Sequence, residues 1–217
     1  MIGHMFNPED DLLVKDRLRP RWSPEGSVVF VTLRTADSIS EQVIRSWERD
    51  KESWLARRGH TGAHWSTLVP SLPKAEQQLF LRVFNRSRED YLDTGEGQCW
   101  LNDAVVARIV HDAILEFDGQ HYRVGNFVIM PNHLHLLVAF PNQSAIRPQL
   151  DAWRDTTAER ARERNGNTGE LWHPEPFYHV LRTVQQFEWL SRFIAENPRK
   201  AGLRSGEFVY RAYGQDR

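Results

Sequence analysis

The stretch "FVIMPNHLHLLVAF", from Phe127 to Phe140, consists of two apolar runs separated by a Pro-Asn pair. Such runs predict two buried strands joined by a tight turn. His133 and His135 open the second run, and because side chains alternate along a strand, both must project from one face of the sheet. Two imidazoles roughly 7 Å apart on one face can bind a divalent cation if a helix supplies a third ligand. The alternative is a pair of hydrogen-bonded, partly exposed sheet histidines.

The remainder of the sequence predicts an α+β domain. The segment "SVVFVTLRT" (Ser27–Thr35) is rich in β-branched residues and predicts a buried strand. Several segments carry apolar residues at helical spacing, some of them after a Ser, Asn or Asp that can cap a helix. Few strands, joined by hairpins or helices, predict a mixed or antiparallel sheet with helices packed mainly on one face. The expected helices span Ser40–Gly59, Lys74–Asp93, Leu101–Gly119, Ser144–Asn167 and Thr183–Asn197, and the tail Gly206–Arg217 adds a short strand.

Composition and charge exclude several classes of protein. The 217 residues include no run near the roughly 18 apolar residues of a membrane span, so we expect no membrane partner and a cytoplasmic location. Cys99 is the single cysteine, which excludes an internal disulfide and indicates a reducing compartment. We expect Cys99 to be a small buried residue rather than a nucleophile. The net charge of -1 identifies no nucleic-acid partner, so any phosphate-binding surface must be local.

The histidine hairpin and its flanking segments resemble a known family. "FVIMPNHLHLLV" is similar to the HUH signature of the IS200-like, Y1-type single-strand DNA transposases, and the subgroup it most resembles is the REP-associated tyrosine transposases of bacteria. "VVFVTLRTADSI" resembles the first strand of that subgroup, "AWRDTTA" its basic-x-x-Thr-Ala helix, "GELWHPEPFYHVLRT" the loop that follows, and "RFIAENPRKAGL" its closing motif. The similar segments extend from about residue 27 to 204, with Trp47–Leu72 the least similar part.

The resemblance implies an architecture and a set of partners. It implies one domain over 1–217, made of the first strand, helices and His-x-His hairpin (25–141), the basic helix, loop and nucleophile-position helix (142–204) and a tail (205–217). The sheet would be ferredoxin-like and antiparallel, with His133 and His135 on a central strand and Mg²⁺ or Mn²⁺ bound to them. Single-stranded DNA or DNA hairpins would be the partner, and the protein would be associated with the nucleoid, with a homodimer as one possible form.

The sequence departs from the family at the nucleophile. In the family a helix-borne tyrosine attacks phosphorus and forms a 5′-phosphotyrosine, whereas this chain has Phe193 at that position. A benzyl side chain fills the same space but has no hydroxyl. Asn197 lies one helical turn further on and matches the position that supplies a third, amide-oxygen metal ligand in the family. The alternative role for Asn197 is a helix C-cap before Pro198. Tyr178 is the best replacement for the missing nucleophile.

Candidate DNA contacts follow from the same motifs. Arg154 and Thr157 match the basic-x-x-Thr pattern, and Tyr178 lies in a segment that the family places near DNA. Arg182, Arg199 and Lys200 flank the helix that carries Phe193 and are suited to bind phosphates. The tryptophans Trp100, Trp153 and Trp172 either stack on unpaired bases or belong to the core.

Three functions remain open from the sequence. The first is a transposase or nickase that acts on single-stranded DNA and is inactive as given because of Phe193. The second is a non-catalytic module that binds DNA hairpins on the same scaffold. The third, weaker hypothesis is metal-dependent phosphodiester hydrolysis at His133 and His135 with water as the nucleophile.

Overall fold

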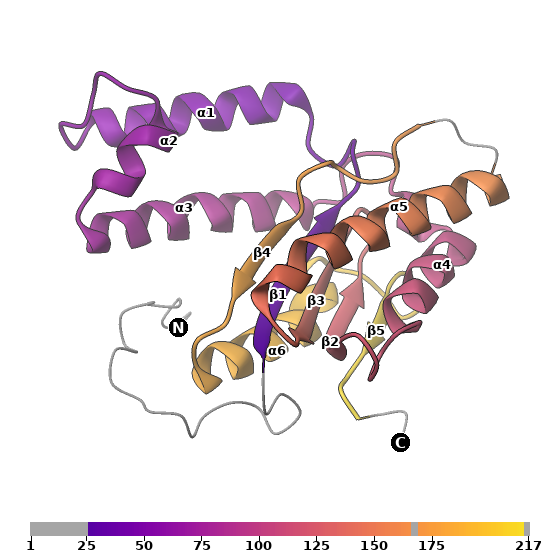
Figure 1. The fold of residues 1–217 in the computed structure, drawn as a ribbon. Helices are drawn as coiled ribbons and strands as arrows, with labels where there is room; N and C mark the ends of the chain where they lie inside the picture. The colour runs from indigo at the N-terminus through magenta and orange to yellow at the C-terminus, as the bar shows by residue number, and fades with distance from the viewer. Residues whose placement is uncertain (1–25, 166–168, 215–217) are drawn as a thin grey trace. The chain divides into compact units, whose positions relative to one another are not determined.

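The computed structural model describes residues 26–165 and 169–214 (Figure 1). Their contacts gather into two compact units, a helical unit that contains Ile39–Thr94 and a sheet unit that contains the remaining described residues. The sequence predicts one domain over 1–217. The helical unit within it is compact in its own right, because it buries a small apolar core made of Trp54, Leu55, Val69, Leu72 and Phe80.

The sheet unit is built on five antiparallel strands in the order β4-β1-β3-β2-β5. The first four strands and the helices between them follow the β-α-β-β-α-β order of a ferredoxin-like fold. The expected α+β class and antiparallel sheet are therefore confirmed, and β3, which carries both histidines, is the central strand. The strands are β1 (Ser27–Arg34), β2 (Arg123–Ile129), β3 (His133–Phe140), β4 (Phe177–Val180) and β5 (Val209–Arg211).

Helices cover both faces of this sheet. Alternate residues of β3, among them Leu134, Leu136 and Val138, pack in one cluster with α4 (Ala104–Leu115) and α5 (Ile146–Asn165). Leu137 belongs to a separate cluster with α6 (Val184–Lys200). Two helices thus lie on one face, as expected, and α6 covers the other. Because His133 and His135 share the alternation of Leu137, they lie on the α6 face.

Local signals explain where the helices of the sheet unit begin. The carboxylate of Asp103 accepts hydrogen bonds from the backbone N–H groups of Val105 and Val106, so Asp103, one of the two predicted caps, is the N-cap of α4. The hydroxyl of Thr183 accepts from the N–H of Gln186 and caps α6 in the same way. These caps fix the starts of the helices that pack on opposite faces of the sheet.

The C-terminus of α6 differs from the prediction that Pro198 ends the helix. The helix continues through Pro198 to Lys200, and Ala201 is its C-cap. A proline so close to the end removes one intrahelical hydrogen bond only, and the following N–H groups still find partners. The N–H of Ala201 donates to the carbonyl of Asn197, and that of Leu203 donates to the carbonyl of Pro198. Asn197 therefore lies inside the helix and is not its C-cap.

The helical unit contains three helices that lie between β1 and α4 in the sequence. The predicted N-cap of the first helix is confirmed, since the Ser40 hydroxyl accepts from the N–H of Val43. The weakly similar segment Trp47–Leu72 belongs to this unit. The three helices are α1 (Glu41–Ala56), α2 (Trp65–Leu68) and α3 (Lys74–Leu92).

No helix in the described ranges is long and apolar enough to cross a membrane.

Candidate metal and nucleic-acid site

His133 and His135 form a buried pair at the start of β3. Both residues are fully buried, and their ring centroids lie 4.7 Å apart. The predicted projection from one face is confirmed, because the ring of His135 also stacks on Phe30 and contacts Phe193 of α6. Of the alternative of hydrogen-bonded, partly exposed sheet histidines, the exposure is wrong, since both rings are fully buried.

Hydrogen bonds to Nδ1 orient both imidazoles. Nδ1 of His133 lies 2.7 Å from Oδ1 of Asn132, whose Nδ2 donates to the carbonyl of Glu96 at 2.9 Å. This second bond fixes the amide so that its oxygen faces the ring, and His133 therefore carries its proton on Nδ1. Nδ1 of His135 lies 3.0 Å from the hydroxyl of Thr32, its partner across β1 and β3. With Nδ1 engaged, Nε2 is the nitrogen that each ring can offer to a cation, as in metal-binding histidines generally.

Phe193, at the expected nucleophile position, lies directly beside this pair. Its ring centroid is 5.1 Å from that of His135 and 6.0 Å from that of Phe30. Trp189, one turn earlier on α6, stacks on Phe193 with ring planes 11° apart. The structure thus brings together the two histidines and Phe193, the residue at the predicted nucleophile position.

The packing of α6 determines the level of Asn197 along the sheet. Phe187 packs against Ala139, and Phe193 packs against His135, so α6 runs antiparallel to β3. One further turn advances Asn197 about 6 Å along the helix, and His133 lies about 7 Å beyond His135 along the strand. Asn197, one turn beyond Phe193, therefore lies toward the His133 end of β3, and its side chain is buried.

The donor atoms of His133, His135 and Asn197 are of types that suit a divalent cation. They are two imidazole nitrogens and one amide oxygen. Across 26–165 and 169–214, no group of three or more His, Cys, Asp and Glu side chains is placed to hold a metal, so a third protein ligand to a cation here would have to be of another type. Amide oxygens and waters suit both Mg²⁺ and Mn²⁺. The two imidazoles favour Mn²⁺ over Mg²⁺.

Tyr178, the predicted replacement for the nucleophile, and Tyr210 of β5 lie on different faces of the sheet. Tyr178 pairs with Val31, whose side chain belongs to the core on the α4–α5 face. Since paired residues project to the same side, Tyr178 faces away from the histidines. Tyr210 pairs with Val128, which in turn pairs with His135, so Tyr210 shares the histidine face.

Thr157 has a structural role that the sequence did not reveal. It is buried, its hydroxyl donates to the carbonyl of Trp153 at 2.6 Å, and it accepts from Nε1 of Trp172 at 2.7 Å. The prediction that Thr157 contacts DNA is therefore wrong. Trp153 and Trp172 belong to the core, as one of the two alternatives held, and Trp100 packs partly buried against it.

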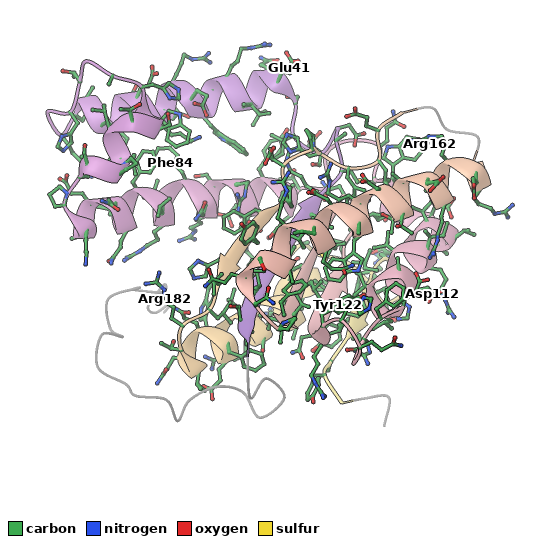
Figure 2. All side chains as sticks on the ribbon, in the orientation of Figure 1. Glu41, Phe84, Asp112, Tyr122, Arg162 and Arg182 are labelled. Atoms are coloured by element: carbon green, nitrogen blue, oxygen red, sulfur yellow. The ribbon has the colours of Figure 1, made fainter. Side chains whose placement is uncertain are left out.

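The cationic candidates are distributed around α6 and α5. Arg199 and Lys200 are exposed in the last turn of α6, close to the level of Asn197. Arg182 is exposed between β4 and α6, near the other end of the helix (Figure 2). Arg154 is partly buried on α5 and forms an ion pair with Asp151 at 2.9 Å. Arg199 and Lys200 thus lie on the last turn of α6, shortly after Asn197, whereas Arg182 precedes the helix.

Cys99 lacks the environment of a nucleophile. Burial, followed by the charges of Asp37 and Glu96, raises the pKa of its thiol above the ordinary value. The thiol therefore stays protonated at neutral pH and donates to the carbonyl of Gly95 at 3.0 Å.

Sequence reasoning missed the two residues that orient the imidazoles. Asn132 directly precedes His133, and a polar residue next to a ligand candidate is the signal that could have identified it. Thr32 is a polar residue within an apolar strand, but only the register between β1 and β3 shows that it meets His135.

Similarity to known proteins is weak. The sequence matches no protein-family model, and no curated protein is significantly similar to it. Among solved structures, that of a REP-associated tyrosine transposase bound to a REP hairpin matches over 86% of this chain and 74% of its own, with 11% sequence identity and a TM-score of 0.42. A similarity at this level does not assign the chain to a family.

Proposed function

We propose that this chain has the scaffold of a tyrosine HUH transposase or nickase that acts on single-stranded DNA at hairpins, with its nucleophile position filled by Phe193. The observation that supports this most is the contact between Phe193 and His135, whose ring centroids are 5.1 Å apart. A tyrosine in place of Phe193 would carry its hydroxyl on a ring that already lies beside the candidate metal ligands.

Each residue of the site has a chemical role in this proposal. His133, His135 and Asn197 would hold Mg²⁺ or Mn²⁺, and Asn132 and Thr32 keep the imidazoles oriented. The cation, when bound, draws negative charge from the phosphate oxygens, which assists attack by a phenol whose pKa is otherwise near 10. Burial of the histidines by α6 limits the access of water, and Arg199 and Lys200 would bind flanking phosphates.

A second function, a non-catalytic module that binds DNA hairpins, is favoured by the surroundings of Phe193. The ring contacts Trp189, Phe30 and His135, an aromatic environment that suits a side chain without a hydroxyl. In this function the chain keeps the binding surface, and Phe193 serves as a packing residue of α6.

Restoring the hydroxyl distinguishes the two functions. We would incubate the chain and its Phe193→Tyr variant with a labelled DNA hairpin that has single-stranded flanks, in Mn²⁺ or Mg²⁺. If the first proposal is correct, only Phe193→Tyr should form an SDS-resistant protein–DNA species. This species should disappear when His133→Ala is combined with Phe193→Tyr. Hairpin binding without an adduct from either protein would favour the non-catalytic module. An adduct from the Phe193 form would contradict both proposals, because it would require a nucleophile at another position. Tyr210 would then be the first candidate, since it shares the histidine face.

A further inference from the structure

A cavity of about 270 Å³ lies between α4 and the segment that leads into β5 (Figure 1). Leu101, Ala104 and Phe208 are among the residues that form its apolar wall. Asn102 and Arg108 are among those that add polar groups. A concave apolar site with a few polar side chains is the usual form of a ligand-binding pocket.

Hydrogen bonds hold both walls of this cavity. On one side, the N–H of Leu101 donates to the carbonyl of Pro131 at 3.0 Å, and the side chain of Asp103 caps α4. On the other side, Arg204 and Glu207 are joined twice. The N–H of Arg204 donates to the carboxylate of Glu207 at 2.6 Å, and the N–H of Glu207 donates to the carbonyl of Arg204 at 3.1 Å. The cavity is therefore preformed.

The cavity lies at the end of the sheet that carries His133. Pro131, which binds Leu101, belongs to the turn that directly precedes His133. Val209, on the opposite wall, pairs with Ile129, the last residue of β2. Since β2 alone separates β5 from β3, the two strands are two spacings apart, about 10 Å. At roughly 3.4 Å per nucleotide of a stacked strand, this distance corresponds to about three nucleotides.

The charges around the cavity do not suit a phosphate. Asp112, labelled in Figure 2, accepts from Nε of Arg108 at 3.0 Å and lies 2.8 Å from Nδ1 of His111. Glu207 adds a second carboxylate on the opposite wall. Two carboxylates thus accompany one guanidinium, so a neutral group suits the cavity better than an anion does.

The polar side chains of the cavity are of the types that bind purines. Asn102 is exposed, and the side chain of Arg108 is 74% exposed despite its ion pair, so both are accessible to a ligand. An Asn amide forms two hydrogen bonds with adenine, and the Arg fork forms two with guanine. Phe208 provides an aromatic ring, a group on which bases stack. The volume equals that of about nine waters at roughly 30 Å³ each, which suits a single base.

We propose that this cavity binds one unpaired purine of the single-stranded DNA next to the hairpin, with Asn102 and Arg108 hydrogen-bonding its edge and Phe208 contacting its face. The inference rests on the proposed function, since the base belongs to the strand whose phosphate reaches the histidine pair. It adds residues that the sequence motifs did not identify. It also gives the chain a means of selecting DNA sequence, which phosphate contacts alone do not provide.

The test measures equilibrium binding of a fluorescent DNA hairpin with single-stranded flanks, followed by anisotropy in the presence of Mn²⁺. Each flank position is made abasic in turn. Removal of the base at one purine position should weaken binding to the parent about tenfold, the scale of one lost stacked base. A pyrimidine at that position should also weaken binding, but less than the abasic site does.

Three variants examine the protein side of the contact. Ala104→Leu fills the cavity from an exposed position in the first turn of α4 and should weaken binding about as much as the abasic substitution. Its matched control, Ala75→Leu, makes the same change at an exposed alanine in the first turn of α3 and should bind as the parent does. Asn102→Ala should weaken binding about tenfold, the loss expected for one bidentate base contact. Melting temperatures establish that every variant is folded.

Combining the two kinds of change identifies the contact. The hairpin that is abasic at the sensitive position should bind Ala104→Leu and Asn102→Ala no more weakly than it binds the parent, because both changes remove the same contact. Additive losses at every position, or an Ala104→Leu variant that binds like Ala75→Leu, would overturn the inference and leave the proposed function intact.

Two further outcomes have distinct meanings. If free dAMP or dGMP competes as well as the unlabelled hairpin does, the cavity is a site for free nucleotides and the inference is overturned. If the parent does not bind the hairpin at all, the proposed function fails and this inference fails with it.

Discussion

The hydroxyl of Thr32 and Nδ1 of His135 lie 3.0 Å apart, joined across β1 and β3 although the residues are 103 positions apart in the sequence. The bond is buried and fixes the plane of the imidazole that also contacts Phe30 and Phe193. The orientation of His135 therefore depends on a residue of another strand rather than on its own neighbours.

Thr32→Val tests this dependence, because it removes the hydroxyl and nearly keeps the shape of the side chain. Partners of this kind typically contribute 10–100-fold to metal affinity, so we expect Mn²⁺ to bind roughly that much more weakly. Isothermal titration calorimetry measures the change. The control is Thr94→Val, a change in the helical unit, and equal affinity of Thr32→Val and the parent would show that the hydroxyl does not orient a metal ligand.

His133→Ala should abolish the Mn²⁺ site. The variant removes one of two imidazole ligands in a set of three protein donors, and the amide of Asn197 binds too weakly to replace it. Titration of Mn²⁺ into the parent should give one site, and titration into His133→Ala should give none. The exposed His121 supplies the control, His121→Ala, which should titrate as the parent does; identical curves for all three proteins would refute the metal assignment.

The form of DNA that binds follows from the shape of the sheet unit. The histidines and the predicted phosphate contacts lie on or beside a sheet face covered by α6, and no described element is shaped to enter a major groove there. We expect a hairpin with unpaired flanks to bind more tightly than a blunt duplex of equal length, with affinity falling steeply as salt increases. Competition anisotropy measures both properties. Equal competition by the blunt duplex would contradict the proposed preference.

Thr157→Val should destabilise the fold without affecting DNA binding. The substitution leaves Nε1 of Trp172 buried without its acceptor at 2.7 Å, a loss of about 1–3 kcal/mol in the free energy of unfolding. Urea denaturation measures this loss, and Thr156→Val, the adjacent and more exposed position, is the control. A large loss of hairpin affinity in folded Thr157→Val would restore the original prediction that this hydroxyl contacts DNA.

His179 should make the fold sensitive to mild acid. Burial first, and then the charge of Arg182, lowers the pKa of His179, so the folded state favours the neutral ring. As the pH falls below about 6.5, the unfolded chain binds protons before the folded one does, and the free energy of unfolding decreases. Denaturation at pH about 7 and about 5.5 should show a smaller decrease in His179→Gln than in the parent. An equal decrease in both proteins would assign the acid sensitivity to other groups.

Local patterns in the sequence determined the parts of the structure that depend on nearby residues. Alternation along "HLHLLVAF" placed His133 and His135 on one face, and the Pro-Asn pair placed the hairpin between β2 and β3. Ser40 and Asp103 cap their helices, because an N-cap is a contact within one turn. The fold class followed from the order of these elements.

Tertiary structure alone decided which of these elements meet. The four-residue edge strand β4 carries too little periodicity to be predicted, and its register places Tyr178 away from the histidines. The sequence does not encode the register of β1 against β3 in any local pattern, yet this register brings Thr32 to His135 and Arg34 to His133. Strand register is set by the packing of whole faces, and a shift of one residue would exchange those faces. The site is therefore a property of the assembled sheet, although only one residue separates its two histidines in the sequence.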